Sequence, residues 1–359
     1  MDPSEHNCYD YAHTVLMGSF PVQADLMMHE LRSSSIGYEH LHQYVQSWRW
    51  PRRLEGRSAT GKDAMNAKRA ESSKKAGTFK CSASEALSLC TVMAHWLRRV
   101  VEPTGRHNLA VQAFLLLVRV MEMLVASARG VVTPEALALA ITRYLIAFSR
   151  AHDIDDMIPK FHYMLHFARI LKKFGWLPNC TALERKHKTP KRYAGANNNT
   201  SKGYDSSVLR EVTCKSLHDL EHGEHLDLQP GLISPRPAKG RMLAWLKSAL
   251  GPNNEYKCSR DARHSAFEQS SQGDIVAIRS VDGASWSVGE VWFHASCDDV
   301  CFSAISVFEL VAMSRTYSEW RDVDHPEVVA PEDIMDVLIH SMCGNECTVL
   351  HTYSLQGKG

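Results

Sequence analysis

Apolar residues recur at helical spacing over the first half of the chain. Between residues 13 and 50 they repeat every three or four positions, and Pro51 with the two arginines after it ends the run. This pattern predicts two helices. Three longer apolar runs predict buried helices, each with a start signal: from a cap at Ser82 or Ser84 to Arg99, from Asn108 to Ala128, and from Thr133 and Pro134 to Arg150.

The stretches between and after these runs have other patterns. Residues 52–78 are rich in Arg, Lys, Ser, Gly and Ala, which predicts a basic flexible loop. Pro159 opens a shorter helical run that Gly175 closes, and a further helix is expected from about Ser206 to His222. Prolines and polar residues are scattered over residues 224–272, which indicates a linker with one helix near residues 241–250.

From Gly273 onward, apolar and polar positions alternate at the spacing of strands. The segments GDIVAIRS, WSVGEVWFHAS and VCFSAISVFELV predict a small antiparallel barrel or sheet. Its aromatic residues could form a stacking face for a ligand, but a module of this size needs them in its core, which is the expected arrangement of Trp286, Trp292, Phe293 and Phe302. The predicted fold class is therefore mainly α with a small C-terminal β module.

Composition narrows the classes of function. Lys plus Arg (41) nearly cancels Asp plus Glu (40), so any affinity for nucleic acid must come from local clusters. The start of the chain lacks the pattern of a secretory signal, and the most apolar stretch is broken by Arg119 and Glu122. We expect an intracellular protein without a membrane partner. Its ten cysteines show no CxxC pair, so we expect reduced, mostly buried thiols.

Positive charge is concentrated in one stretch. Between residues 160 and 202 there are ten Lys or Arg residues and a single acid, Glu184. Such a run is either a solvated basic face without a ligand or a surface that binds the phosphate backbone of nucleic acid. In the second case, the affinity for nucleic acid falls as the salt concentration rises. The candidate contacts with DNA are Lys160, Arg169, Lys172, Lys173, Arg185, Lys186, Lys188, Lys191 and Arg192.

Two histidines in the same stretch are candidate metal ligands. His162 and His166 are four residues apart on one predicted helix, a spacing that presents two imidazoles to one Zn²⁺ ion. Cys180 and His187 would complete a set of four ligands. The alternative is that the two histidines are buried and hydrogen-bonded near Glu184, without a metal.

Three segments, in order, resemble the coding regions of CACTA-like (En/Spm-type) transposable elements over roughly residues 8–222. The first, CYDYAHTVLMGSF, matches the family's strand-end motif at Asp10 and His13, although Ala12 replaces the usual Met. The second comprises YVQSWRWPRR and FKCSASEALSLC. The third begins IPKFHYMLHFARILKKFGWLPNCTALERKHK and is similar to the family's block of Pro-Lys-x-His-x-x-x-His, Phe-Gly and Glu-Arg/Lys-Lys-His.

The resemblance implies a transposase of the DDE superfamily, with an RNase H-like core and a helical insertion domain. Such enzymes cut and join DNA with two divalent ions, Mg²⁺ or Mn²⁺, held by shared carboxylates. By this resemblance Asp10 is the second acidic ligand and Glu184 the third. The first would lie on a strand that precedes Asp10, where the chain has only nine residues. We therefore expect an N-terminally truncated core with impaired or absent strand cleavage, in a nuclear protein.

Together, these patterns predict six regions along the chain. They are a partial RNase H-like segment with the first helices (1–51), the basic flexible loop (52–78), a helical insertion domain (79–158), the His/Glu/basic block that closes the transposase core (159–223), the linker (224–272) and the small β-rich module (273–359).

The expected function is that of a transposable-element-derived protein with residual DNA binding. One alternative is a catalytically silent interaction or scaffold protein, or a gene fragment without a function. Another is a structural zinc protein that uses the His162 set of ligands. Binding of duplex DNA at increasing salt separates the first two, whereas unfolding by chelators would identify the third.

Overall fold

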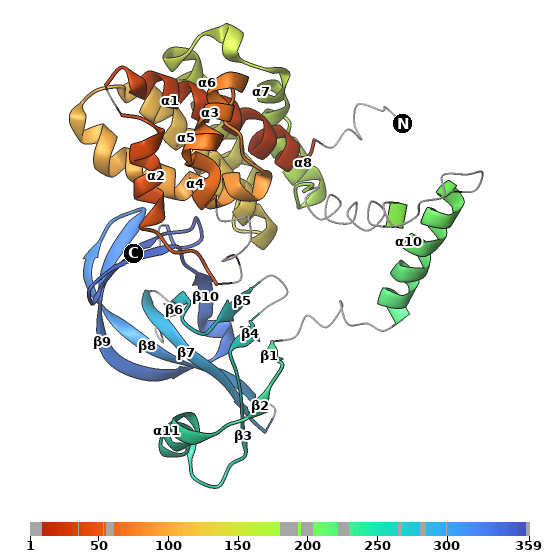
Figure 1. Ribbon diagram of the computed structural model, residues 1–359, viewed down its shortest axis with the longest axis vertical. Coiled ribbons are helices and arrows are strands. Elements are labelled where there is room, and N and C mark those ends of the chain that lie inside the picture. The colour runs from red at the N-terminus through yellow and green to blue at the C-terminus, as the bar shows by residue number, and fades with distance from the viewer. Residues whose placement is uncertain are drawn as a thin grey trace.

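A helical part and a sheet part lie end to end, with the helices at the top of Figure 1 and the sheet below them. This computed structural model describes residues 9–34, 36–52, 54, 61–179, 193–194, 204–221, 230–264, 268–280, 285–298 and 300–356. About half of the described residues are in helices and a quarter are in strands. The predicted class, mainly α with a small C-terminal β module, is therefore wrong, because the C-terminal part is a large antiparallel sheet.

The helical part begins with a π-helical segment that leads directly into the first α-helix. Its elements in chain order are η2 (Ala12–Ser19), α1 (Phe20–Arg32), α2 (Tyr38–Gln46), η3 (Lys62–Met65), α3 (Ala67–Ala76), α4 (Ala83–Trp96), η4 (Leu97–Val101), η5 (Glu102–Thr104), α5 (Asn108–Ala126), η6 (Ser127–Arg129), α6 (Pro134–Ala151), η7 (Ile154–Asp156), α7 (Pro159–Met164) and α8 (Phe167–Phe174). A separate helix, α10 (Tyr204–Glu221), lies to one side of both parts in Figure 1.

Local sequence signals set the helix boundaries. Ser82 caps α4 by accepting a hydrogen bond from the Glu85 amide, while the Glu85 carboxylate accepts one from the Ser82 amide. Thr133 caps α6, and Gly175 adopts a φ of 73° after α8. The helices predicted before Pro51 and over residues 82–99, 108–128, 134–150, 159–175 and 206–222 are confirmed, with one break between α7 and α8.

Helix α5 lies at the centre of the helical core. Phe114 and Leu117 are fully buried, and the Phe114 ring packs on Phe20 of α1 with 5.9 Å between centroids. By length and composition, the segment Asn108–Arg129 is the one helix among the described residues that could cross a membrane. Since 61% of its most apolar window is buried inside the protein, packing in the helical part accounts for its apolar sequence.

The prediction of a basic flexible loop over residues 52–78 is wrong for its second half, which folds into η3 and α3. The Asn66 side chain accepts a hydrogen bond from the Arg69 amide at 3.0 Å and caps α3. The Arg69 guanidinium then pairs with both carboxylate oxygens of Glu85 on α4. A cap and one ion pair therefore hold a helix that has few apolar residues to bury.

Among the described residues, nine strands form one antiparallel sheet. The main order is β10–β6–β7–β8–β9–β12–β11, and β3 pairs with β7 and also with β2. Three further strands, β1, β4 and β5, form a second, smaller sheet. The strands are β1 (Gly231–Ile233), β2 (Arg236–Pro237), β3 (Tyr256–Ser259), β4 (Asp261–Arg263), β5 (Gln269–Ser271), β6 (Ile275–Arg279), β7 (Trp286–Cys297), β8 (Val300–Met313), β9 (Tyr317–Val329), β10 (Ile334–Val337), β11 (His340–Cys343) and β12 (Glu346–Leu350).

The predicted linker over residues 224–272 is wrong from residue 231 onward, where β1 to β5 and α11 (Gly240–Leu250) are found. The helix near residues 241–250 is confirmed. Pro237 lies in β2, which pairs with β3 alone among the described strands, so the missing N–H costs no hydrogen bond of the sheet. Pairing with the distant strand β7 holds β3, and no local pattern reveals such a pairing.

The aromatic residues of the sheet part form its core, as expected. Trp286, Phe293 and Phe302 are buried and Trp292 is half-buried. They belong to two separate clusters. The eight cysteines in the described part of the chain are unpaired, but only three of them are buried, so the expectation of mostly buried thiols is wrong.

The RNase H-like core is also contradicted. Such a fold carries its acidic residues on a central sheet. Among the described residues, however, the first strand is β1, which begins at Gly231. Before it, Arg49 forms only an isolated bridge with His340. Asp10 precedes a helical segment and does not end a strand. The segments expected to form a partial RNase H-like core and a helical insertion domain belong to one continuous helical core.

Candidate functional site

The N-terminal segment Tyr9–Phe20 packs against α7, far later in the chain. The Lys160 ammonium donates a hydrogen bond to the backbone oxygen of Met17 at 3.1 Å. The Ser19 hydroxyl lies 3.6 Å from the sulfur of Met164. The first and third segments of the transposase resemblance are therefore neighbours in space, although the sheet that would join them in an RNase H-like fold is not formed by the described residues.

The same segment also contacts the chain that follows α8. The Tyr11 amide donates to the oxygen of Pro178 at 3.2 Å, and the Asn179 side chain donates to the Tyr11 hydroxyl at 2.6 Å. Burial raises the pKa of Tyr11, with a further rise from the adjacent Asp10, so the phenol stays neutral and acts as a hydrogen-bonding group. Asp10 is thereby held close to the residues that lead into the basic run.

Asp10 acts as the cap of η2. Its two oxygens accept hydrogen bonds from the amides of Ala12 (3.1 Å) and His13 (2.9 Å), and the His13 ring bonds to one of them at 2.5 Å. The side chain is only 12% exposed. Both carboxylate oxygens accept hydrogen bonds from the first amides of the helical segment, as a capping side chain does. The arrangement of Asp10 therefore fits helix capping better than metal catalysis.

His162 of α7 and His166, which precedes α8, lie in a group of contacting rings with Tyr9 and Tyr163. Tyr9 stacks on Tyr163 with centroids 4.5 Å apart and on His166 at 5.1 Å, and the two imidazoles are 5.2 Å apart and nearly perpendicular. His162 is exposed and His166 half-buried, so the alternative of two buried histidines is wrong. Burial, His162 and Arg169 lower the pKa of His166. Within the described residues, no group of three or more His, Cys, Asp or Glu is placed to hold a metal ion.

Helix α8 has one buried apolar face and one exposed cationic face. Phe167, Ile170 and Leu171 point into the core. Three exposed cations, Arg169, Lys172 and Lys173, lie on the other side, and the exposed Trp176 follows the end of the helix; we call these four residues the α8 face. No acid occurs between residues 159 and 179, so this segment carries a net positive charge.

The rest of the predicted site lies outside the described residues. The predicted third acidic ligand is Glu184, and the other two predicted zinc ligands are Cys180 and His187. The second half of the basic run consists of Arg185, Lys186, Lys188, Lys191 and Arg192. The pairing of Asp10 with Glu184 and the four-ligand zinc site stay predictions. The structure assigns positions to Lys160, Arg169, Lys172 and Lys173 only, and Lys160 is half-buried against η2.

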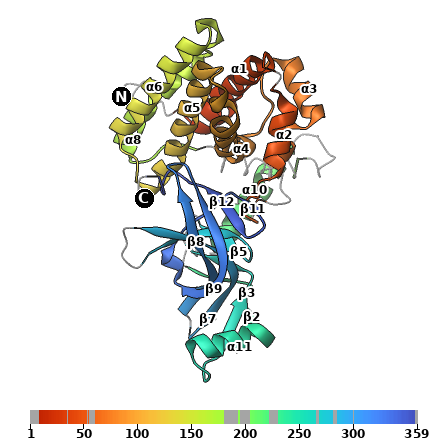
Figure 2. The same cartoon turned by 90° about the vertical axis from the view of Figure 1, so that its left-hand side faces the viewer.

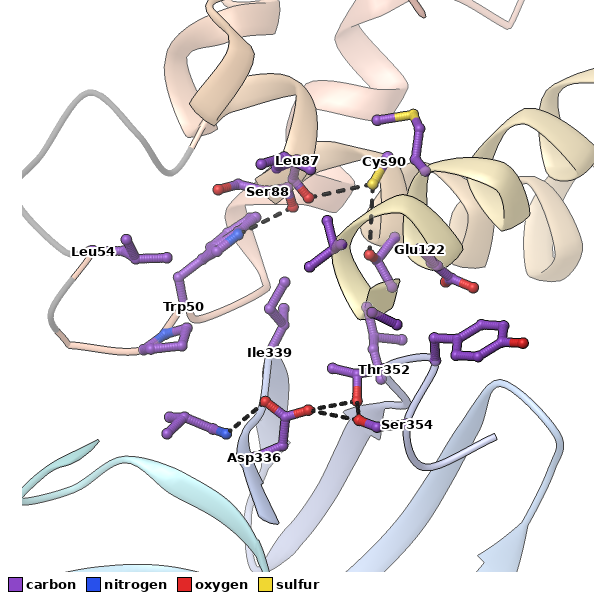
Figure 3. Close-up of a pocket in the computed structure, with 18 of the residues that line it drawn as sticks. Trp50, Leu54, Leu87, Ser88, Cys90, Glu122, Asp336, Ile339, Thr352 and Ser354 are labelled. Carbon is purple, nitrogen blue, oxygen red and sulfur yellow. Dashed lines mark hydrogen bonds between the residues drawn. The ribbon is translucent and has the colours of Figure 1, made fainter. Parts of the chain in front are cut away.

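A cavity of about 290 Å³ lies where the helical part meets the sheet part (Figure 3). Its walls are mainly apolar, with Trp50, Leu87 and Ile339 among them. At its edge the Asp336 carboxylate accepts hydrogen bonds from the Thr352 hydroxyl at 2.6 Å and the Ser354 hydroxyl at 3.2 Å (Figure 3). The sequence gives no signal for this cavity because distant segments form it.

The polar edge of this cavity joins the two parts of the protein. Arg129, at the end of η6, forms ion pairs with Asp336 at 3.2 Å and with Glu268 at 2.8 Å. The Asp336 oxygens are therefore already filled by protein donors, so this edge holds the joint together and has little capacity for a ligand.

Glu122 of α5 also lines the cavity. Its side chain is 14% exposed, accepts a hydrogen bond from Gln356 at 3.1 Å, and has Arg119 at 3.8 Å. Burial raises the pKa of Glu122 to about 7, and the neighbouring Gln356 and Arg119 limit that rise. A carboxyl with this pKa is partly protonated near neutral pH.

Comparison with known proteins gives no relative. No protein-family model, curated protein or solved structure matches this chain with statistical significance. The assignment of a function therefore depends on the chemistry of the described surfaces and on the motif resemblance.

Proposed function

We propose that this protein is a transposable-element-derived DNA-binding protein of the nucleus that contacts the phosphate backbone through the α8 face and cleaves DNA weakly or not at all. The observation that carries the proposal is the spacing of Arg169, Lys172 and Lys173, which directs three exposed cations to one side of a helix whose other side is anchored in the core.

Two further features support this proposal. The α8 face leads directly into residues 180–192, where the sequence adds five more Lys or Arg residues and the acid Glu184. The packing of Tyr9–Phe20 on α7 also brings together two segments that resemble transposases. The strongest competing explanation is that Lys172 and Lys173 only stabilise the negative end of the α8 dipole.

Neutralising the α8 face tests the proposal. We expect the variant Arg169→Gln/Lys172→Gln/Lys173→Gln to bind duplex DNA more weakly and to lower the slope of log K against log salt by about 3, roughly 1 for each lost phosphate contact. Fluorescence anisotropy with a labelled duplex, at several salt concentrations, measures both quantities.

The matched control removes two lysines and one arginine around α11, at the far end of the sheet part in Figures 1 and 2. Lys239→Gln/Arg241→Gln/Lys247→Gln changes three exposed residues and leaves net charge equal to that of the first variant. It should bind like the wild type. Equal binding by both triple variants, or binding that does not respond to salt, would remove the DNA-binding proposal and favour a scaffold role.

A further inference from the structure

Trp176 is an exposed tryptophan held in a fixed backbone. It is 56% exposed, which is unusual for the largest apolar side chain. Before it, Gly175 adopts the left-handed conformation that ends α8, and after it Leu177 is buried in the helical core. The oxygen of Pro178 accepts the hydrogen bond from Tyr11. Because the chain is anchored on both sides, the exposure of the indole is a feature of the fold.

The chemistry around Trp176 is cationic. The exposed side chains of Arg169, Lys172 and Lys173 lie on the helix that ends just before it. Phe174 is 39% exposed, and the Lys173 ammonium lies 5.5 Å from the centre of its ring. A purely apolar partner would not complement the positive charge of this surface. A ligand that carries both negative charge and flat aromatic surfaces satisfies the cations and the rings together.

We propose that the α8 face binds unpaired nucleic acid by stacking a base on the indole of Trp176 while the three cations contact the flanking phosphates. This inference rests on the proposed DNA binding and specifies the form of nucleic acid. Bases in a duplex expose their edges and hide their faces, so only an unpaired base offers its face to a side chain. Stacking accepts any base, so no preference for sequence is expected.

The test compares Trp176→Ala with the wild-type full-length chain on three labelled probes of equal length. The probes are a single-stranded thymidine oligonucleotide, the same backbone with abasic sites in place of the bases, and a duplex. Trp176→Ala should lose roughly tenfold in affinity for the thymidine strand, and little for the duplex or the abasic strand. Trp176→Phe, which keeps an aromatic face, should retain most of the affinity for the thymidine strand.

Leu165→Ala is the control for a general loss of apolar surface, because Leu165 is 49% exposed at the turn between α7 and α8. It should leave all three affinities unchanged. The inference is overturned if Trp176→Ala binds the thymidine strand like the wild type, or if its affinities for all three probes fall equally. Failure of the wild type to bind any probe would overturn the proposed DNA binding as well, so the two failures are distinct.

Discussion

The Glu122→Gln variant is expected to be more stable than the wild type at pH 8 and nearly equal to it at pH 4. Burial raises the pKa of Glu122 to about 7, well above its usual value of 4.5. Between pH 4.5 and pH 7, Glu122 is therefore protonated in the folded state and ionised in the unfolded chain. The stability that Glu122 contributes is complete below pH 4.5 and is lost as pH rises towards 7, whereas a neutral glutamine adds no such pH dependence.

The size of this effect follows from the shift in pKa. A rise of this extent corresponds to about 3 kcal/mol of unfolding free energy above pH 8. Glutamine has nearly the same shape and can still accept the hydrogen bond from Gln356. Urea unfolding of both proteins at pH 4, 6 and 8 measures the difference, and Glu71→Gln, on the exposed side of α3, is the control. A difference that stays constant with pH would show that Glu122 does not titrate in this way.

Gly289→Val is expected to destabilise the sheet part by about 3 kcal/mol or more, through overpacking. Gly289 lies within β7, opposite Val276 of β6 and Val307 of β8. A Cβ atom at this position would lie 2.5 Å from the Ile305 side chain and 2.5 Å from the backbone oxygen of Ser306. The side chain can move, but the backbone oxygen is fixed by the sheet, so adjacent strands would have to separate.

Gly231→Val is the matched control, because Gly231 also lies in a strand and a Cβ atom there meets nothing within 4 Å. Unfolding monitored by tryptophan fluorescence compares the two variants, since Trp286 and Trp320 report on the sheet core. The control should remain close to the wild type. A Gly289→Val protein as stable as Gly231→Val would mean that β7 and β8 are not packed as described.

The sequence predicted the helices well because their signals are local. The Ser82 and Glu85 capping box, the Thr133 cap and Gly175 each act within a few residues of the helix end that they define. The helix α3 was missed because its stability depends on the pairing of Arg69 with Glu85 of another helix. The short strands β1 and β3 were missed because their partners, β4 and β7, are distant in sequence.

The candidate site was predicted in part for the same reason. The cations of α8 are visible as a run of Lys and Arg, and helical spacing alone places Arg169, Lys172 and Lys173 on one side. Trp176 lies beyond the helix, after the left-handed Gly175, so helical spacing does not place it and the sequence does not show that it is exposed. The stacking of Tyr9 on Tyr163 and His166 depends on tertiary packing, as does the capping role of Asp10 beside α7.

The contact between DNA and the α8 face can be observed directly by hydrogen–deuterium exchange of the full-length protein with and without a saturating duplex. The predicted result is slower amide exchange in α7, α8 and the segment Tyr9–Phe20 that packs on them. Exchange in the strands β6 to β9 should be unchanged. Protection that appears only in the sheet part, or DNA binding without any protection of residues 159–179, would contradict the proposed interface.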